Sequence, residues 1–104
     1  MIRTIFPPKT QSFFKEFCLK NQIAYLAVFG SFARGEAETD SDIDFLVDFS
    51  KKTKQKLSLF DLAKIQLALE KKFDRKVDLV LKDNLKPILK PYIQKDLVGL
   101  YEKE

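Results

Sequence analysis

Two helices are predicted from apolar residues that recur three and four positions apart. We expect the first to be capped by Thr10 and to end near Asn21, and the second to begin at the S-x-x-D start signal of Ser58 and Asp61. The apolar face of the first holds Phe13, Phe14, Phe17 and Cys18. The apolar face of the second holds Leu62, Ile65, Leu69 and Phe73, and this helix is expected to cover a sheet.

Three strands are predicted between and after these helices. The apolar run 23–29 lies between the polar Gln22 and Gly30, which suits a buried strand better than a helix. Residues 42–49 and 77–81 are the other two strands. Between the first two strands, Ser31 is expected to cap a brief helical turn that Gly35 ends.

The remaining segments are predicted to be a loop and a helical tail. Residues 50–56 hold four lysines and no apolar residue, which favours a solvated loop. Pro87 and Pro91 divide the tail into a short turn and a last helix. One side of that helix would hold Ile93, Leu97, Leu100 and Tyr101. The order of elements predicts an α/β (α+β) fold in one domain, residues 1–104, with a small mixed sheet and helices mainly on one face.

Composition limits the chemistry that the chain can perform. Of its 104 residues 45% are hydrophobic, which is enough for a core, and Cys18 is the only cysteine, so no internal disulfide can form. The chain has no histidine, so acid-base or metal chemistry falls to carboxylates. No apolar run is long enough to span a membrane and no signal peptide is recognisable, so we expect a soluble cytoplasmic protein.

Charge divides the chain into two unlike halves. Residues 1–50 carry 5 Lys or Arg against 7 Asp or Glu, a balance of −2, while residues 51–104 carry 14 against 8, a balance of +6. A basic second half could bind an anionic partner, or its lysines could simply be scattered over the surface. The sequence leaves both interpretations open.

The acidic stretch after Gly30 suggests a phosphate and metal site. In a strand Asp42 and Asp44 would project from one face, where two like charges repel unless a cation such as Mg²⁺ lies between them. Gly30 allows close backbone approach, Ser31 offers a hydroxyl and N–H groups at a helix start, and Arg34 adds a forked donor for phosphate oxygens. The alternative is an exposed strand face with two ordinary acids.

The combination G30-S31-F32-A33-R34-G35 with S41-D42-I43-D44 resembles the signature of the polymerase-beta superfamily of nucleotidyltransferases, and more narrowly its minimal nucleotidyltransferase group. The resemblance implies transfer of a nucleoside monophosphate, with ATP as the donor. It assigns Gly30 and Ser31 to the triphosphate. Two Mg²⁺ ions would be held by Asp42, Asp44 and Asp78.

The same resemblance implies a protein partner. Members of this group commonly pair with a helical HEPN protein in toxin-antitoxin modules, which implies an antitoxin that adenylylates a tyrosine of the toxin. The partner surface would be formed by the tail residues Tyr92, Ile93, Leu97, Leu100 and Tyr101, unless these pack on the chain's own sheet.

Three alternatives accompany this hypothesis. The chain could be a catalytically weak module that neutralises its partner by contact alone. Asp78 could be a salt-bridged surface acid rather than a metal ligand and general base. The third alternative is a nucleic-acid modifying or binding domain, which the lysines of residues 51–56 suggest. These lysines have no interleaved aromatic residue on which bases could stack, so nucleic acid is not expected as a direct partner.

Overall fold

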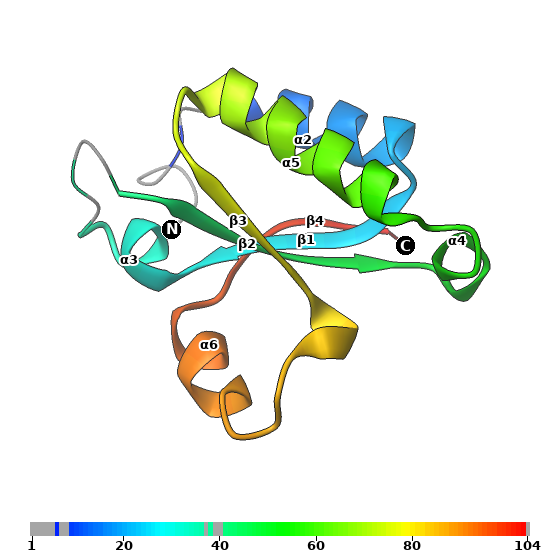
Figure 1. Ribbon diagram of the computed structural model, residues 1–104. Coiled ribbons are helices and arrows are strands. Elements are labelled where there is room, and N and C mark those ends of the chain that lie inside the picture. The colour runs from blue at the N-terminus through cyan, green and yellow to red at the C-terminus, as the bar shows by residue number, and fades with distance from the viewer. Residues whose placement is uncertain (1–5, 7–8, 37, 39–40, 104) are drawn as a thin grey trace.

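Four strands form one mixed sheet in the order β3-β2-β1-β4 (Figure 1). The computed structural model describes residues 6, 9–36, 38 and 41–103. β1 (Ile23–Phe29) is antiparallel to both β2 (Ile43–Phe49) and β4 (Val98–Glu102), whereas β3 (Val77–Leu81) is parallel to β2. The predicted fold class is confirmed.

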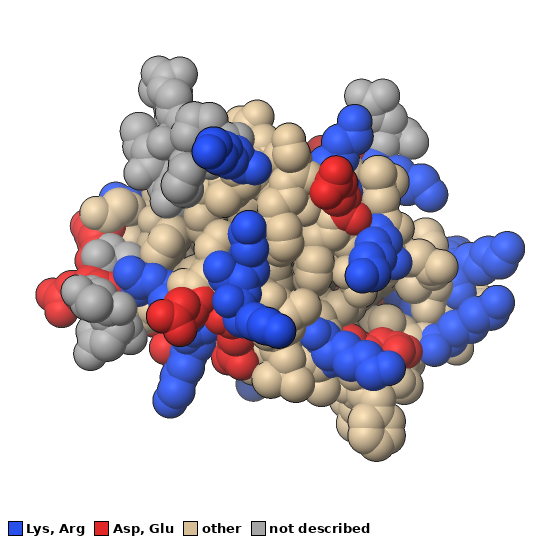
Figure 2. Space-filling view, turned by 90° about the horizontal axis from the view of Figure 1, so that it is seen from above, with Lys and Arg blue, Asp and Glu red and all other residues tan. Residues whose placement is uncertain are grey.

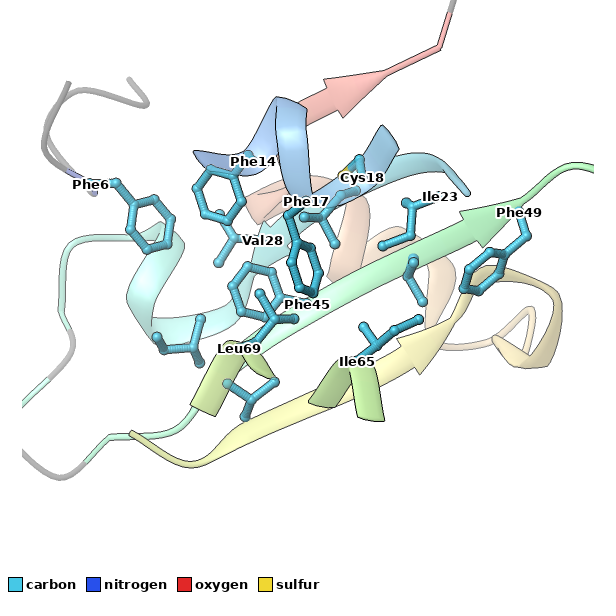
Figure 3. Packing of buried hydrophobic residues seen from close by; sticks show 14 residues of the cluster. Phe6, Phe14, Phe17, Cys18, Ile23, Val28, Phe45, Phe49, Ile65 and Leu69 are labelled. Carbon is cyan, nitrogen blue, oxygen red and sulfur yellow. The ribbon is translucent and has the colours of Figure 1, made fainter. Parts of the chain in front are cut away.

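Helices α2 (Thr10–Lys20) and α5 (Leu59–Phe73) cover one face of this sheet (Figure 1). Their buried residues meet the strands in a core rich in phenylalanine (Figure 3). Phe45 of β2 is fully buried, with its ring centroid 6.2 Å from Phe14 and 6.3 Å from Phe73. Burying a side chain of this size contributes about 1.5–3 kcal/mol. The core therefore fixes which face of β2 points inward.

Cys18 lies in this core with no exposed surface. Burial raises the pKa of its thiol to about 12, because the thiolate would lose its hydration. The residue is thus structural, as the helical spacing predicts. Among the described residues, no helix has the length and apolar character needed to cross a membrane.

The predicted start of α5 is confirmed, and two other predicted caps are wrong. Ser58 Oγ accepts from the Asp61 N–H at 3.2 Å while Asp61 Oδ2 accepts from the Ser58 N–H at 2.9 Å, which completes a capping box. In α2, Lys9 occupies the N-cap position and Thr10 is the first helical residue. In α3 (Gly30–Ala33), Ser31 lies inside the helical turn rather than at its cap.

The lysine-rich segment is a helix, not a loop. α4 (Lys51–Lys54) begins after Ser50, whose hydroxyl oxygen accepts a hydrogen bond from the Thr53 N–H at 3.3 Å. Lys54 then bridges Asp48 of β2 at 3.0 Å and Asp83 at 2.7 Å. A capping serine and this ion-paired lysine support a turn of helix that has no buried residue of its own.

The tail differs most from its prediction. After a 3₁₀ turn (Lys82–Asn84), α6 (Lys90–Asp96) lies on the sheet face opposite α2 and α5 (Figure 1), and the chain then forms β4. Leu100 and Tyr101 thus belong to an edge strand and pack against the core, so the predicted last helix is wrong beyond Asp96. Tyr92 remains exposed.

Candidate active site

Two carboxylates are brought side by side by the pairing of β2 with β3. Asp44 and Asp78 are register partners in these parallel strands. Ile43 and Phe45, which flank Asp44, are buried in the core, so Asp44 and its partner point to the opposite face of the sheet. Asp78 is exposed and Asp44 is half-buried. The predicted proximity of these two acids is present in the fold.

The electrostatics of Asp44 place further charges nearby. Its pKa is raised above the ordinary carboxyl value, first by burial and then by the charges of Asp78 and Asp42, while Arg34 acts in the opposite direction. The charges of Asp42, Asp78 and Arg34 therefore lie near enough to Asp44 to influence its ionisation. The surroundings of Asp44 thus make its ionisation more costly than that of a carboxyl group in water.

Gly30 lies directly against Asp44. Its neighbour Phe29 is the cross-strand partner of Asp44, and Gly30 itself has φ +76°. A Cβ atom at this position would overlap Asp44 Oδ2. Glycine is thus required both by the backbone conformation and by the carboxylate beside it. Ser31 follows as the second residue of α3, which places the Gly-Ser turn next to the acids.

Arg34 has protein partners that its expected role did not include. Its Nε donates to Glu36 Oε1 at 2.8 Å and its Nη1 to Asp96 Oδ2 at 2.7 Å. The second contact ties α6 to α3 beside the site. Because an arginine has five N–H donors, these two bonds leave donors for another group. A role in phosphate binding stays a prediction.

Arg75 is a residue of the site region that sequence reasoning missed. Its Nη1 donates to the carbonyl oxygens of Glu38 at 2.7 Å and Ser41 at 3.0 Å, and its guanidinium carbon lies 5.3 Å from the Phe32 ring centroid. One side chain thus joins the helical turn after Gly30 to the residue before Asp42. Its partners are two backbone carbonyls and a ring, so no charge pattern marks it in the sequence.

Comparison with known proteins places this geometry in a family. Residues 11–100 match the family model described as "Nucleotidyltransferase domain". The chain belongs to this family. All of the predicted site residues lie within the matched segment of the nucleotidyltransferase.

Curated relatives of this nucleotidyltransferase carry a related name. This chain is 38% identical over 73 residues to "Protein adenylyltransferase MntA" of Thermococcus cleftensis, and the alignment covers 70% of each chain. It is also 35% identical over 82 residues to MJ0435 of Methanocaldococcus jannaschii, a candidate protein adenylyltransferase, covering 79% of this chain and 84% of the relative.

Solved structures agree with the family. A structure of a candidate minimal nucleotidyltransferase aligns with a TM-score of 0.71 and 33% identity, covering 86% of this chain and 88% of the other. A toxin-antitoxin structure with AMP-PNP aligns with a TM-score of 0.73, 20% identity and coverage of 90% and 74%. A complex of a tri-AMPylated HEPN toxin of Shewanella oneidensis with its MNT antitoxin aligns with a TM-score of 0.65 and 18% identity, covering 91% and 71%. The last two likenesses show a shared fold. The predicted membership of the minimal nucleotidyltransferase group is confirmed.

The acidic side chains of the nucleotidyltransferase site are hard oxygen donors of the kind that Mg²⁺ prefers. Within the described part of the chain, no three acidic or cysteine side chains are arranged so that they could hold a metal ion by themselves. Mg²⁺, however, is commonly bound by one or two carboxylates together with substrate phosphates. The paired Asp44 and Asp78 supply two hard oxygen ligands. The pKa of Asp44 is raised first by burial and then by the neighbouring acids, and a bound cation would offset the second cause. The residues fit a magnesium-triphosphate complex better than a free ion.

Proposed function

We propose that this nucleotidyltransferase transfers AMP from ATP to a hydroxyl group of a protein, a tyrosine of a HEPN-type toxin, and thereby acts as its antitoxin. The observation that carries the proposal is the contact of the Gly30 turn with Asp44, beside the register partner Asp78. The names of the curated relatives and of the solved toxin-antitoxin complexes support the choice of AMP and of the partner. We place the reaction in the cytoplasm, where ATP is available.

Each predicted site residue has a role in this proposal. Gly30 and Ser31 receive the triphosphate through backbone N–H groups and the serine hydroxyl, and Arg34 donates to phosphate oxygens. Asp42, Asp44 and Asp78 would hold Mg²⁺, two ions in the full site, which neutralise charge on the phosphates as the reaction proceeds.

The transfer is a single displacement at the α-phosphorus of ATP. The acceptor oxygen forms a bond to the α-phosphorus, the bond from that phosphorus to the oxygen that bridges to the β-phosphate breaks, and pyrophosphate leaves with the electron pair. The proton of the acceptor hydroxyl passes to Asp78, which is exposed on the same sheet face as Asp44 and thus accessible to a bound partner.

A labelled-transfer assay tests the proposal. The full chain is incubated with ATP labelled at the α-phosphate, MgCl₂ and the purified product of the neighbouring gene. We expect label on the partner protein, and none with Asp44→Asn. Label on free RNA ends would assign a different acceptor. No label on any acceptor, with toxin activity still suppressed, would contradict the transfer reaction.

A second candidate function is neutralisation of the partner by contact alone. It is favoured by the absence, among the described residues, of three side chains that could hold a metal together, and by the ion pairs that already engage Arg34. The two functions can be distinguished in cells that express the toxin. If Asp44→Asn with Asp78→Asn protects those cells as well as the parent chain does, contact is sufficient. If protection is lost while the complex still forms, transfer is required.

A further inference from the structure

Two adjoining cavities lie at the end of the sheet opposite the paired carboxylates. They have volumes of about 450 Å³ and about 260 Å³ and share Gln22, Thr53 and Lys56 in their linings. They run between the end of α2, the short helix α4 and the beginning of α5. Together they form a groove, which we call the basic groove after the lysines that line it: Lys20, Lys52, Lys56, Lys64 and Lys103.

The lysines of the basic groove have no acidic partner within ion-pair distance among the described residues. Lys54, which lies on α4 but outside the groove, shows the contrast, since it pairs with Asp48 and Asp83. The one acid in the groove lining is Asp61, whose Oδ2 accepts from the N–H and the hydroxyl of Ser58 in the capping box.

The lysines therefore leave an excess of positive charge along the groove. Lysine and arginine side chains gather at the α4 end of the molecule in Figure 2. Single surface lysines need no ligand, but five along one hollow repel one another. That repulsion makes an anionic ligand favourable.

An aromatic residue, Tyr101, lines the larger of the two cavities. Tyr101 and Lys103 come from the end of β4, which pairs with the beginning of β1, and they line the same cavity as Lys52 and Lys56 of the α4 region. Ile23 and Ala24 add apolar surface. The fold thus places an aromatic ring beside the lysine-rich segment, although the sequence places no aromatic residue within it.

The basic groove is separate from the candidate active site. Ile23, at the first position of β1, lines the groove, whereas Phe29, at its last position, pairs with Asp44. A seven-residue strand is about 20 Å long at roughly 3.3 Å per residue. A ligand in the groove would therefore not occupy the triphosphate site.

We propose that the basic groove binds the sugar-phosphate backbone of a single-stranded nucleic acid, with one base against Tyr101. Two joined hollows suit an extended ligand, and the lysines in both linings could contact successive phosphates of one strand. A positively charged groove combined with an aromatic ring is the common arrangement for sequence-independent binding of single strands. An acidic protein segment would match the charge but would gain less from the ring. The proposal does not depend on AMP transfer.

Fluorescence anisotropy of a labelled 12-nucleotide single-stranded RNA with the full chain tests the proposal. We expect binding at 50 mM salt that weakens as salt rises, with a slope of log affinity against log salt of about −0.7 for each phosphate contacted. Lys52→Gln with Lys56→Gln should reduce affinity roughly tenfold and flatten that slope by about 1.4. The charge-matched control is Lys86→Gln with Lys90→Gln, on exposed tail residues outside the groove, which should bind nearly as the parent does.

Tyr101 provides a second, independent arm. Tyr101→Phe keeps the ring and should bind like the parent, whereas Tyr101→Leu should lose roughly fivefold or more in affinity if a base stacks on the ring. The melting temperature of the Tyr101→Leu variant is measured as well, because Tyr101 also packs against the core and its loss could destabilise the fold. Equal binding of a single-stranded DNA would support backbone recognition. No binding at 50 mM salt, an equal effect of the control pair, or equally strong competition by a poly-glutamate peptide would overturn the proposal.

Discussion

Replacing Gly30 by alanine would place a Cβ atom where the Asp44 carboxylate now lies. Gly30 has φ +76° and an added Cβ overlaps Asp44 Oδ2, whereas Gly35 has φ +75° and no atom within 4 Å of an added Cβ. The two alanine variants thus share the backbone strain and differ in the overlap. Gly35→Ala is the matched control for Gly30→Ala.

The expected magnitudes come from these two contributions. A left-handed backbone costs a residue with a Cβ atom roughly 1–2 kcal/mol, so both variants should lose about that much free energy of unfolding. For a domain of this size the melting temperature should fall by roughly 4–16 °C. In Gly30→Ala the carboxylate must also retreat by about 1 Å to reach ordinary contact distance. A displacement of that size can reduce a rate about 100-fold, or about 2.7 kcal/mol of transition-state free energy.

The assay is the initial rate of AMP transfer from labelled ATP to the partner protein, at a temperature where calorimetry shows both variants folded. Gly35→Ala should transfer at nearly the parental rate despite its lower melting temperature. Gly30→Ala should be about 100-fold slower. If both variants transfer equally well, the position of the Asp44 carboxylate does not matter to the reaction, and the site is assigned wrongly.

Three further predictions concern the charged residues. Asp78→Asn should keep most of the triphosphate affinity but slow transfer by roughly 100-fold, as expected for a lost general base. The control Asp83→Asn, which removes only an exposed ion pair, should transfer near the parental rate. An Asp78 variant that transfers at the parental rate would exclude Asp78 from the active site. Asp44→Asn should raise the melting temperature at pH 7 in the absence of metal. The pKa of Asp44 is raised in the folded state, so the folded protein loses stability as pH rises from the ordinary carboxyl pKa through the raised one. The asparagine does not ionise and avoids this loss. Calorimetry from pH 3 to 7 checks this, and an equal or lower melting temperature at pH 7 contradicts it. Arg34→Ala should weaken triphosphate binding roughly tenfold, as measured by titration calorimetry. Asp96→Asn, which removes the partner of Arg34 on α6, should weaken binding less. Equal losses in the two variants would mean that Arg34 acts by holding α6 in place.

Much of the fold follows from local patterns because those patterns have local causes. The capping box of Ser58 and Asp61 requires only residues three apart, and the structure contains it. The strands 23–29 and 77–81 are short apolar runs that also match. The alternation around Asp44 likewise identified its face correctly, since buried neighbours on both sides leave no other choice.

The tail could not be predicted in the same way. Leu97, Leu100 and Tyr101 have a spacing that fits a helix, yet residues 98–102 pair with β1 on the edge opposite β2. Pairing of this kind depends on residues about 75 positions away. α4 was missed for a different reason, because a helix with no buried residue has no apolar period and only Ser50 marks its start.

The candidate site is predictable where it follows a contiguous motif. Gly30, Asp42 and Asp44 lie within one short stretch, and their proximity is present in the structure. Asp78 was identified through the resemblance, and its register with Asp44 comes from parallel pairing that no local pattern encodes. The role of Arg75 could not be predicted from the sequence, because its hydrogen-bond acceptors are backbone carbonyls, which every residue possesses.

The arginine that joins the two halves of the site makes their spacing insensitive to acidity. A guanidinium keeps its charge at any pH a cell experiences, and neither carbonyl oxygens nor a phenyl ring take up or release protons there. The chain has no histidine, and its one thiol has a pKa raised to about 12 by burial. The Arg75 contacts to Phe32, Glu38 and Ser41, which link the helical turn after Gly30 to the residue before Asp42, therefore do not depend on pH in this range. A change of pH would therefore act on this site through the Asp44 carboxylate rather than through the Arg75 contacts.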